Sequence, residues 1–181
     1  IYMRIFLLYI APFIKSLLPI HTESNISIPA YIGEWHQVAT SRSTALLGTG
    51  IHFTNVTAIY NTTNTSDLSV FNHGYDKNHL ETYIEGFSYP TDSTQTKRKV
   101  HFYGVPADGN YWITKLGPIQ NKQYQYAIVS GPITPFFGTR FSLYVLARNK
   151  QHYLNTYQNE VLQWCRDNFF IFYWNKYIPT P

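Results

Sequence analysis

The chain has 181 residues, of which 44% are hydrophobic and 13% charged, with a formal net charge of +4 at pH 7. This length suits one domain with a substantial core and leaves no room for a second full domain. The charge is modest and its densest basic run is Lys97-Arg98-Lys99, so composition does not indicate a nucleic-acid-binding protein. The single cysteine, Cys165, cannot form an internal disulfide or a CxxC motif, which argues against a disulfide scaffold and structural zinc.

The N-terminal residues have the pattern of an export signal. Arg4 precedes an apolar run from Ile5 to Ile14, which has the length of a signal-peptide core and is too short to span a bilayer comfortably. We therefore predict a signal peptide or a hydrophobic arm over residues 1–24, and a secreted or exported protein. Asn-x-Ser/Thr sequences provide candidate glycosylation sites at Asn25, Asn55, Asn61 and Asn64.

From Gly33 onward, short runs of alternating apolar residues recur between turns rich in Gly, Pro, Asn and Asp. This pattern, together with 16 Tyr and 12 Phe, is typical of an all-β barrel or sandwich. The runs predict strands over residues 34–42, 52–60, 67–74, 80–88, 97–104, 110–117, 123–131 and 140–148. Because sequential strands are usually neighbours, this succession favours up-and-down antiparallel connectivity.

One segment, from about residue 150 to 168, has a different period. Its apolar residues recur at helical spacing, and Asn149 can cap its start. We expect one amphipathic helix whose apolar stripe, including Cys165, lies on the outer barrel wall, so the thiol should be buried and inert. The β-prone run that follows, residues 169–174, suggests a ninth strand on the outer wall.

Several runs then resemble one family. The motif Gly33-x-Trp35 resembles the opening signature of lipocalins, and further runs follow in the order and spacing of the bacterial lipocalin and apolipoprotein D-like branch. These runs are residues 55–60, 111–113, 124–132 and 143–148, and the tail 175–181. The resemblance implies an eight-stranded lipocalin (calycin) barrel over residues 25–181, with the C-terminal helix packed outside.

The resemblance also implies structural roles for the signature residues Gly33, Trp35, Tyr124, Tyr126 and Arg148. Trp35 would plug the closed end of the barrel, and Arg148 would lie across its indole and bond nearby backbone. The tyrosines fall in the family's second conserved turn region. Two departures are evident: the loop 41–47 lacks the usual Pro-Asn-aromatic sequence, and the lipoprotein cysteine of the bacterial members is absent, which disfavours a lipid-anchored form.

With Trp35 facing inward, strand alternation predicts the cavity lining, although a shift of one residue inverts each strand's list. The predicted lining is Gln37, Ala39, Val56, Ala58, Tyr60, Phe102, Trp112, Tyr126, Ile128, Leu143 and Val145. An eight-stranded barrel is wide enough to be packed solid or to hold one small ligand. We predict that the protein binds and carries or stores a small hydrophobic ligand, such as a fatty acid, lysophospholipid or sterol. An entrance lined by Lys97, Arg98 or Lys99 would favour an anionic head group.

Alternatives to ligand binding stay open. One is a structural or partner-binding surface protein with a filled barrel, and another is a lipocalin-type enzyme. The sequence has no Gly-x-Ser-x-Gly, His-Glu-x-x-His or phosphate-loop signature, so we expect neither catalysis nor a cofactor. His73 and His79, with Asp76 between them, match no standard metal motif, so exposed loop histidines are the simpler interpretation and no metal site is predicted. Transient membrane contact stays open as a further interaction.

Overall fold

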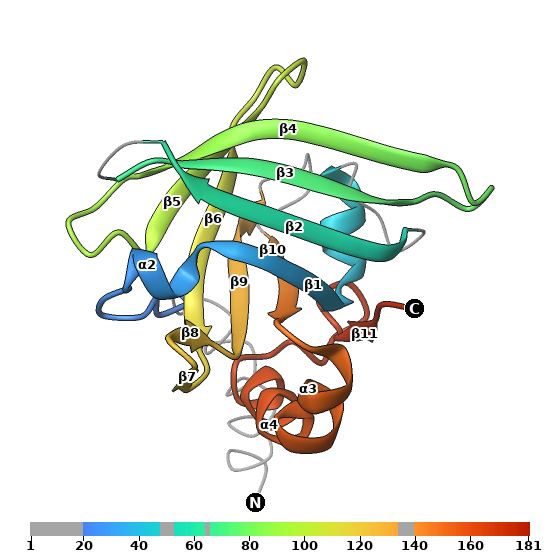
Figure 1. Ribbon diagram of the computed structural model, residues 1–181. Coiled ribbons are helices and arrows are strands. Elements are labelled where there is room, and N and C mark those ends of the chain that lie inside the picture. The colour runs from blue at the N-terminus through green and yellow to red at the C-terminus, as the bar shows by residue number, and fades with distance from the viewer. Residues whose placement is uncertain (1–19, 48–52, 64–65, 134–139) are drawn as a thin grey trace, which may run out of the picture.

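The computed structural model describes residues 20–47, 53–63, 66–133 and 140–181. In this part of the chain, eight antiparallel strands close into a barrel because β1 pairs with both β2 and β10 (Figure 1). The strands are β1 (Gly33–Thr40), β2 (Thr54–Thr62), β3 (Leu68–Tyr75), β4 (Glu81–Pro90), β5 (Lys97–Phe102), β6 (Gly109–Leu116), β9 (Tyr126–Ile133) and β10 (Arg140–Ala147). A small hairpin, β7 (Ile119–Gln120) and β8 (Gln123–Tyr124), interrupts the succession between β6 and β9. The predicted up-and-down barrel is confirmed.

The two walls of the barrel differ in how they are covered. Along β4, burial is largely confined to the positions that face the barrel interior, which is the alternation expected of a strand with one face toward solvent. Strand β9 is buried from Tyr126 to Gly131 without a break, because both of its faces are covered. Its inward residues, Ala127 and Val129, join an inner apolar cluster, while Tyr126 and Ile128 join a second cluster outside the barrel.

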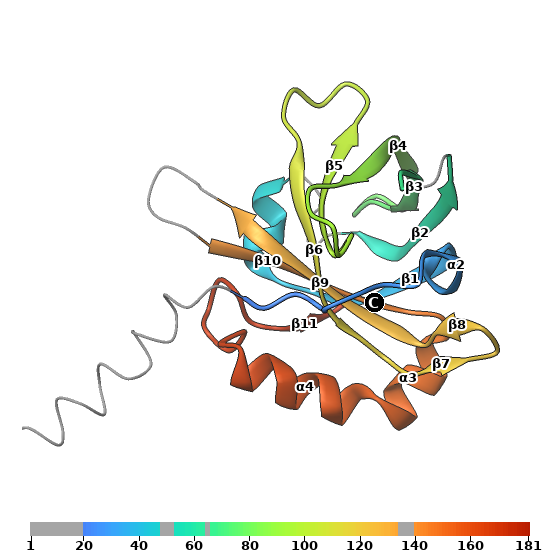
Figure 2. The same ribbon diagram turned by 90° about the vertical axis from the view of Figure 1, so that its left-hand side faces the viewer.

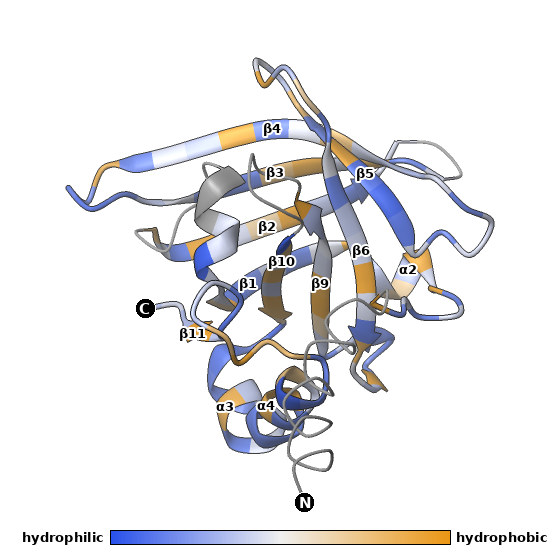
Figure 3. Cartoon of the chain, turned by 180° about the vertical axis from the view of Figure 1, so that it is seen from behind, coloured by the Kyte–Doolittle hydropathy of each residue, from blue (hydrophilic) through white to orange (hydrophobic). Residues whose placement is uncertain are grey.

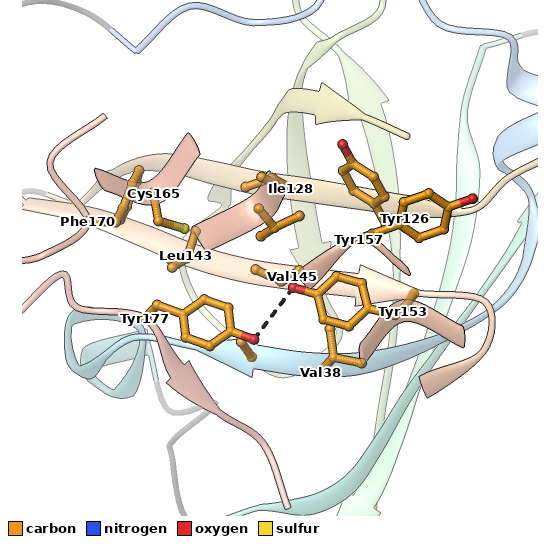
Figure 4. Close-up of a cluster of buried hydrophobic side chains, with 13 residues drawn as sticks. Val38, Tyr126, Ile128, Leu143, Val145, Tyr153, Tyr157, Cys165, Phe170 and Tyr177 are labelled. Carbon is orange, nitrogen blue, oxygen red and sulfur yellow. Dashed lines mark hydrogen bonds between the residues drawn. The ribbon is translucent and has the colours of Figure 1, made fainter. Parts of the chain in front are cut away.

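The outer cluster lies between the C-terminal helices and strands β1, β9 and β10 (Figures 2 and 4). The helices are α3 (Lys150–Thr156) and α4 (Gln158–Asp167), so the predicted helix is present but broken at Tyr157. As predicted, the Asn149 side chain caps the start by accepting the backbone N–H of His152 at 2.8 Å. Cys165 is buried on the apolar stripe, and burial raises the pKa of its thiol to about 12, which keeps it protonated.

The predicted strand over residues 169–174 is wrong. The chain passes through consecutive turns there, and Phe169 adopts a left-handed φ of +64°, which interrupts extended backbone. Phe170 is buried and stacks on Trp164, whereas the four residues after it are exposed. The ninth strand lies further on, as β11 (Ile178–Pro179), which pairs with β1.

Of the segment predicted as a signal peptide or arm, residues 1–19 lie outside the described residues. Residues 20–24 pack along the barrel, and Glu23 ties them down: its N–H donates to the Ile113 carbonyl at 3.0 Å and its carboxylate accepts the Leu116 N–H at 2.9 Å. Its carbonyl accepts the hydroxyl of Thr96 at 2.9 Å. Among the described residues, no helix has the length and apolar character needed to cross a membrane.

Candidate functional site

A cavity of about 350 Å³ lies inside the barrel, a volume within the range of small-molecule sites. Seven of the barrel strands contribute to its wall; β9 does not. The apolar part of the wall is made mainly by Val56, Ala58, Val70, Ile84, Val100, Phe102 and Leu146. Amides and hydroxyls interrupt it at Gln37, Tyr60, Asn72, Asn110, Tyr111 and Tyr144. The wall is therefore mainly apolar with a few polar groups, which suits an apolar molecule that must be held in one orientation.

The closed end is sealed by the short helix α2 (Ile28–Tyr31) and by Trp35, which is fully buried. The Trp35 indole N–H donates to the Tyr31 carbonyl at 2.8 Å. The guanidinium of Arg148 lies over the indole ring and donates to the carbonyls of Ala30, Tyr31 and Ile32. The structure thus places Trp35 and Arg148 where the resemblance implied a plug.

The other signature residues also serve closure and packing. Gly33 has a left-handed φ of +99°, and a Cβ there would come within 3.3 Å of the Arg148 guanidinium, so a larger residue would be strained. Tyr124 accepts the Arg148 Nε–H through its carbonyl and the Ser27 N–H through its hydroxyl. Tyr126 lies on the outer face, where its hydroxyl donates to Glu160 of α4 at 2.8 Å.

Of the residues predicted to line the cavity, five lie on its wall: Gln37, Val56, Ala58, Tyr60 and Phe102. They come from β1, β2 and β5. On these strands the inward register set by Trp35 is carried across directly, since Trp35 pairs with Ala58 in the β1–β2 ladder. The structure places these five side chains on the cavity wall, and their contact with a ligand stays a prediction.

The other six predicted positions are corrections: Ala39, Trp112, Tyr126, Ile128, Leu143 and Val145 do not line the cavity. On β6, β9 and β10 the prediction is one residue out of register, so the inward residues are their neighbours, such as Tyr111, Val129 and Leu146. Ala39 has a different cause: the β1–β10 register shifts between Gln37 and Ala39, and this bulge turns Ala39 outward into the helix-covered cluster. The same shift by one residue would have identified Tyr111, Tyr144 and Leu146 from sequence.

The basic run 97–99 does not line the entrance of the described cavity. The mouth is lined by Phe53, Thr82, Tyr83, Val105 and Ala107, without Lys or Arg among the described lining residues. The run 97–99 begins β5 at the opposite, closed end, as the hydrogen bonds of Arg98 to Ser66 and Ser88 in the neighbouring strands and turns require.

A chain of tyrosine hydroxyls forms the floor of the cavity. The Tyr31 and Tyr111 hydroxyl oxygens are 2.6 Å apart, and the Tyr111 hydroxyl donates to that of Tyr60 at 2.9 Å. Burial raises the pKa of Tyr31 to about 12, and burial likewise raises the pKa values of Tyr60 and Tyr111. All three hydroxyls are therefore protonated at neutral pH and available as donors.

The histidine-containing turn performs a structural task. Asp76 accepts the backbone N–H groups of Asn78 and Leu80 at 2.8 and 2.9 Å, and these bonds lower the pKa of its carboxyl. His79 occupies a left-handed position of the same turn, with φ +59°. Within the described residues, no three His, Cys, Asp or Glu side chains gather as metal ligands would.

Of the candidate glycosylation sites, Asn25, Asn55 and Asn61 are exposed, while Asn64 lies outside the described residues. Exposure makes the first three accessible to a modifying enzyme, and their occupancy stays a prediction.

Comparison with known proteins identifies similar sequences. The sequence model of the lipocalin-like domain family matches residues 26–170. The outer membrane lipoprotein Blc of Vibrio cholerae serotype O1 is 34% identical over 115 residues, which are 62% of this chain and 63% of Blc. The matched part is thus less than two thirds of that relative's length.

Solved structures share the fold at low sequence identity. Lobster apocrustacyanin A1 superposes with a TM-score of 0.61 at 13% identity, covering 85% of this chain and 78% of its own. The siderocalin Ex-FABP, which functions through dual ligand specificities, has a TM-score of 0.56 at 12% identity, covering 83% of this chain and 93% of its own. These likenesses concern the fold alone; Figure 3 shows the barrel from behind, coloured by the hydropathy of each residue.

Proposed function

Because this chain belongs to the lipocalin-like family, we propose that it binds a small hydrophobic ligand in the barrel cavity and carries or stores it. The observation that supports this most directly is the cavity of about 350 Å³, closed at one end and apolar along most of its wall. A barrel filled by its own side chains, as a purely structural or partner-binding protein would have, would leave no such volume.

The expected affinity follows from the area that an alkyl tail would bury. Each buried methylene contributes about 0.8 kcal/mol, so the roughly fifteen carbons of a long alkyl tail contribute about 12 kcal/mol before the cost of association. That cost is at least about 4 kcal/mol, and hydrogen bonds at the polar groups offset part of it. A fatty acid, a lysophospholipid or a sterol would therefore bind with an affinity around micromolar.

Binding without catalysis fits most polar groups of the cavity, whose lining also includes the imidazole of His73. Gln37, Asn72 and Asn110 carry amides that do not titrate, and the tyrosine hydroxyls are held protonated. Such groups orient a ligand by hydrogen bonding but are poor general acids or bases at neutral pH. A lipocalin-type enzyme is accordingly the less favoured alternative.

The decisive experiment is titration with a fluorescent fatty acid, combined with a variant that fills the cavity. Val56→Phe adds a ring to the cavity wall and should weaken probe binding at least about tenfold, while leaving the melting temperature nearly unchanged. The matched control is Ile119→Phe, an exposed position on the β7–β8 hairpin, which should bind as the unsubstituted protein does. Failure of the unsubstituted protein to bind the probe, with no lipid co-purifying by mass spectrometry, would instead favour the filled-barrel alternative.

Export of the protein is also part of this proposal. The name of Blc gives that relative an outer-membrane location, and Arg4 followed by the apolar run Ile5 to Ile14 supports a signal peptide within residues 1–24. Mass spectrometry of the protein recovered from its native host tests this, since cleavage would remove the apolar run, and glycans at Asn25, Asn55 or Asn61 would add mass.

An exposed aromatic loop supports transient contact with an anionic membrane surface. Ile171, Phe172, Tyr173 and Trp174 are 51%, 49%, 63% and 45% exposed in immediate succession. Cations stand over two of these rings: the Arg42 guanidinium is 4.5 Å from the Tyr173 centroid and the Arg140 guanidinium 4.2 Å from that of Trp174. Aromatic rings beside basic side chains are suited to the interface of anionic lipids.

Sedimentation with lipid vesicles tests this contact. The double variant Phe172→Ser/Trp174→Ser should lose most of its binding to phosphatidylserine vesicles, because both the inserted rings and one cation–π pair are removed. Leu80→Ser/Tyr83→Ser, which removes exposed side chains at another site, should bind like the unsubstituted protein. Equal losses in the two variants, or equal binding to phosphatidylcholine vesicles, would contradict a specific anionic-membrane surface.

A further inference from the structure

We propose that the cavity holds an amphiphilic ligand with its polar end innermost, where an acceptor group, most favourably a carboxylate, receives a hydrogen bond from the Tyr60 hydroxyl. This inference rests on the proposed function and specifies the class of ligand, a long-chain carboxylic acid, and its direction in the barrel.

The hydrogen bonds among the three tyrosine hydroxyls run in one direction, toward Tyr60. Each tyrosine hydroxyl has one proton. Tyr111 donates its proton to Tyr60, so the 2.6 Å contact between Tyr31 and Tyr111 must be donated by Tyr31. The Tyr60 hydroxyl is then the last in this chain of hydrogen bonds, and no described residue accepts its proton. Tyr60 is 3% exposed and lies on the cavity wall, so its unused donor faces the space that a ligand would fill.

A buried hydroxyl donor without an acceptor destabilises the ligand-free protein. A ligand whose end group accepts this hydrogen bond therefore binds more tightly, and a hydrogen bond to a charged acceptor is stronger than one to a neutral acceptor. Because burial raises the pKa values of all three tyrosines, none of them ionises at neutral pH to repel a carboxylate. The three hydroxyl dipoles of this hydrogen-bond chain are thus aligned toward the cavity space beside Tyr60.

A buried arginine stands behind this floor. Arg98 is 0% exposed and is paired in register with Tyr111 across β5 and β6. Its guanidinium donates to the Ser88 side chain and to the carbonyls of Ser66 and Ser88, which are neutral acceptors. The Asp67 carboxylate also acts on its charge. The deep end therefore has a buried positive charge that favours an anion over a neutral hydroxyl.

The mouth offers nothing comparable. Its lining includes Phe53, Tyr83, Val105 and Ala107, and no Lys or Arg belongs to the described lining of the whole cavity. A carboxylate placed at the mouth would meet water and, among the described lining residues, no side chain more basic than the His73 imidazole, which lies 3.7 Å from the Glu81 carboxylate. An alkyl tail placed there would lie against apolar side chains. Both ends of the cavity therefore favour the same direction, with the carboxylate at the floor and the tail toward the mouth.

The test compares two ligands on two hydroxyl-deleting variants. Palmitate has an acceptor end group, whereas phenylnaphthylamine is an apolar probe without one. Tyr60→Phe/Tyr111→Phe keeps both rings and removes the donors at the floor, so palmitate affinity should fall about tenfold or more while phenylnaphthylamine affinity is unchanged. The matched control, Tyr83→Phe, removes a hydroxyl from the mouth and should alter neither affinity.

Each other outcome has a definite meaning. A loss of palmitate affinity in Tyr83→Phe but not in the floor variant would place the carboxylate at the mouth and overturn the inference. Equal losses of both ligands in the floor variant would also overturn it, because they would indicate damage to the cavity; retained probe binding excludes misfolding. If neither ligand binds the unsubstituted protein, the proposed function itself fails.

Discussion

The guanidinium carbon of Arg148 lies 3.7 Å from the centroid of the Trp35 indole ring. Trp35 is in the first strand of the barrel and Arg148 directly follows the last, so this pair joins the two ends of the rolled sheet. The contact combines a cation–π attraction of roughly 0.5–2 kcal/mol with hydrogen bonds from the same guanidinium to α2. One side chain therefore holds the plug, the covering helix and the barrel seam together.

Truncation of the plug should weaken the whole fold. Trp35→Ala is expected to lower the free energy of unfolding by roughly 3–5 kcal/mol, because a fully buried indole is replaced by a void. Urea denaturation followed by circular dichroism measures this. Trp112→Ala, which removes a partly exposed indole on the outer wall beside Lys97, should cost clearly less. Equal costs would contradict the position of Trp35 as the plug.

The Arg148 side chain should not be replaceable by lysine. Arg148→Lys keeps the charge but loses the planar fork that reaches the carbonyls of Ala30, Tyr31 and Ile32, so we expect a loss of about 2–3 kcal/mol in the free energy of unfolding. Arg166→Lys is the control, since Arg166 is exposed and bonds only Gln163, and its change should stay within about 0.5 kcal/mol. An unchanged free energy of unfolding in Arg148→Lys would show that the positive charge alone stabilises the seam.

The two faces of β10 should respond differently to truncation. Leu143→Ala removes a side chain from the helix-covered cluster and should cost roughly 2–5 kcal/mol of stability without changing the affinity for a cavity ligand. Leu146→Ala, on the opposite face, enlarges the cavity and should change ligand affinity as well as stability. Parallel thermal melts and probe titrations of the two variants measure both effects. An affinity change in Leu143→Ala would mean that the faces are assigned in reverse.

The buried tyrosines should make the fold sensitive to alkali. The pKa of Tyr31 rises from 10.0 in the unfolded chain to about 12, and those of Tyr60 and Tyr111 also rise. A raised folded-state pKa contributes stability that is fully present below pH 10 and is lost as the pH rises through the folded-state pKa, because the unfolded chain then releases protons that the folded one retains. The free energy of unfolding should therefore fall as the pH rises from about 10 toward about 12.

The control for this alkaline effect is the variant Tyr60→Phe/Tyr111→Phe, in which the fall should be shallower. Urea denaturation at each pH gives the comparison. The same slope in both proteins would mean that other groups cause the loss.

Much of the fold could be predicted because its signals are local. Alternation and turn residues placed all eight strands within a few residues of their observed bounds, and Asn149 marked the start of the helix. The strand prediction for residues 169–174 failed because it used β-branched and aromatic composition, which does not reveal that a residue such as Phe169 adopts a left-handed backbone conformation. The interruption of the helix at Tyr157 likewise left no clear sign in the spacing of apolar residues.

The sequence by itself determined an all-β barrel or sandwich, since a period of two is a property of neighbouring residues, and the resemblance of Gly33-x-Trp35 to the lipocalin signature implied the barrel and its Trp35 plug. Which side of β6, β9 and β10 faces the cavity was decided only in three dimensions. Helix α4 covers the outside of β9 and β10, so both faces are apolar and alternation no longer distinguishes them. The bulge before Ala39 and the meeting of Tyr31, Tyr60 and Tyr111 at the floor depend in the same way on strand register, which joins residues far apart in the chain.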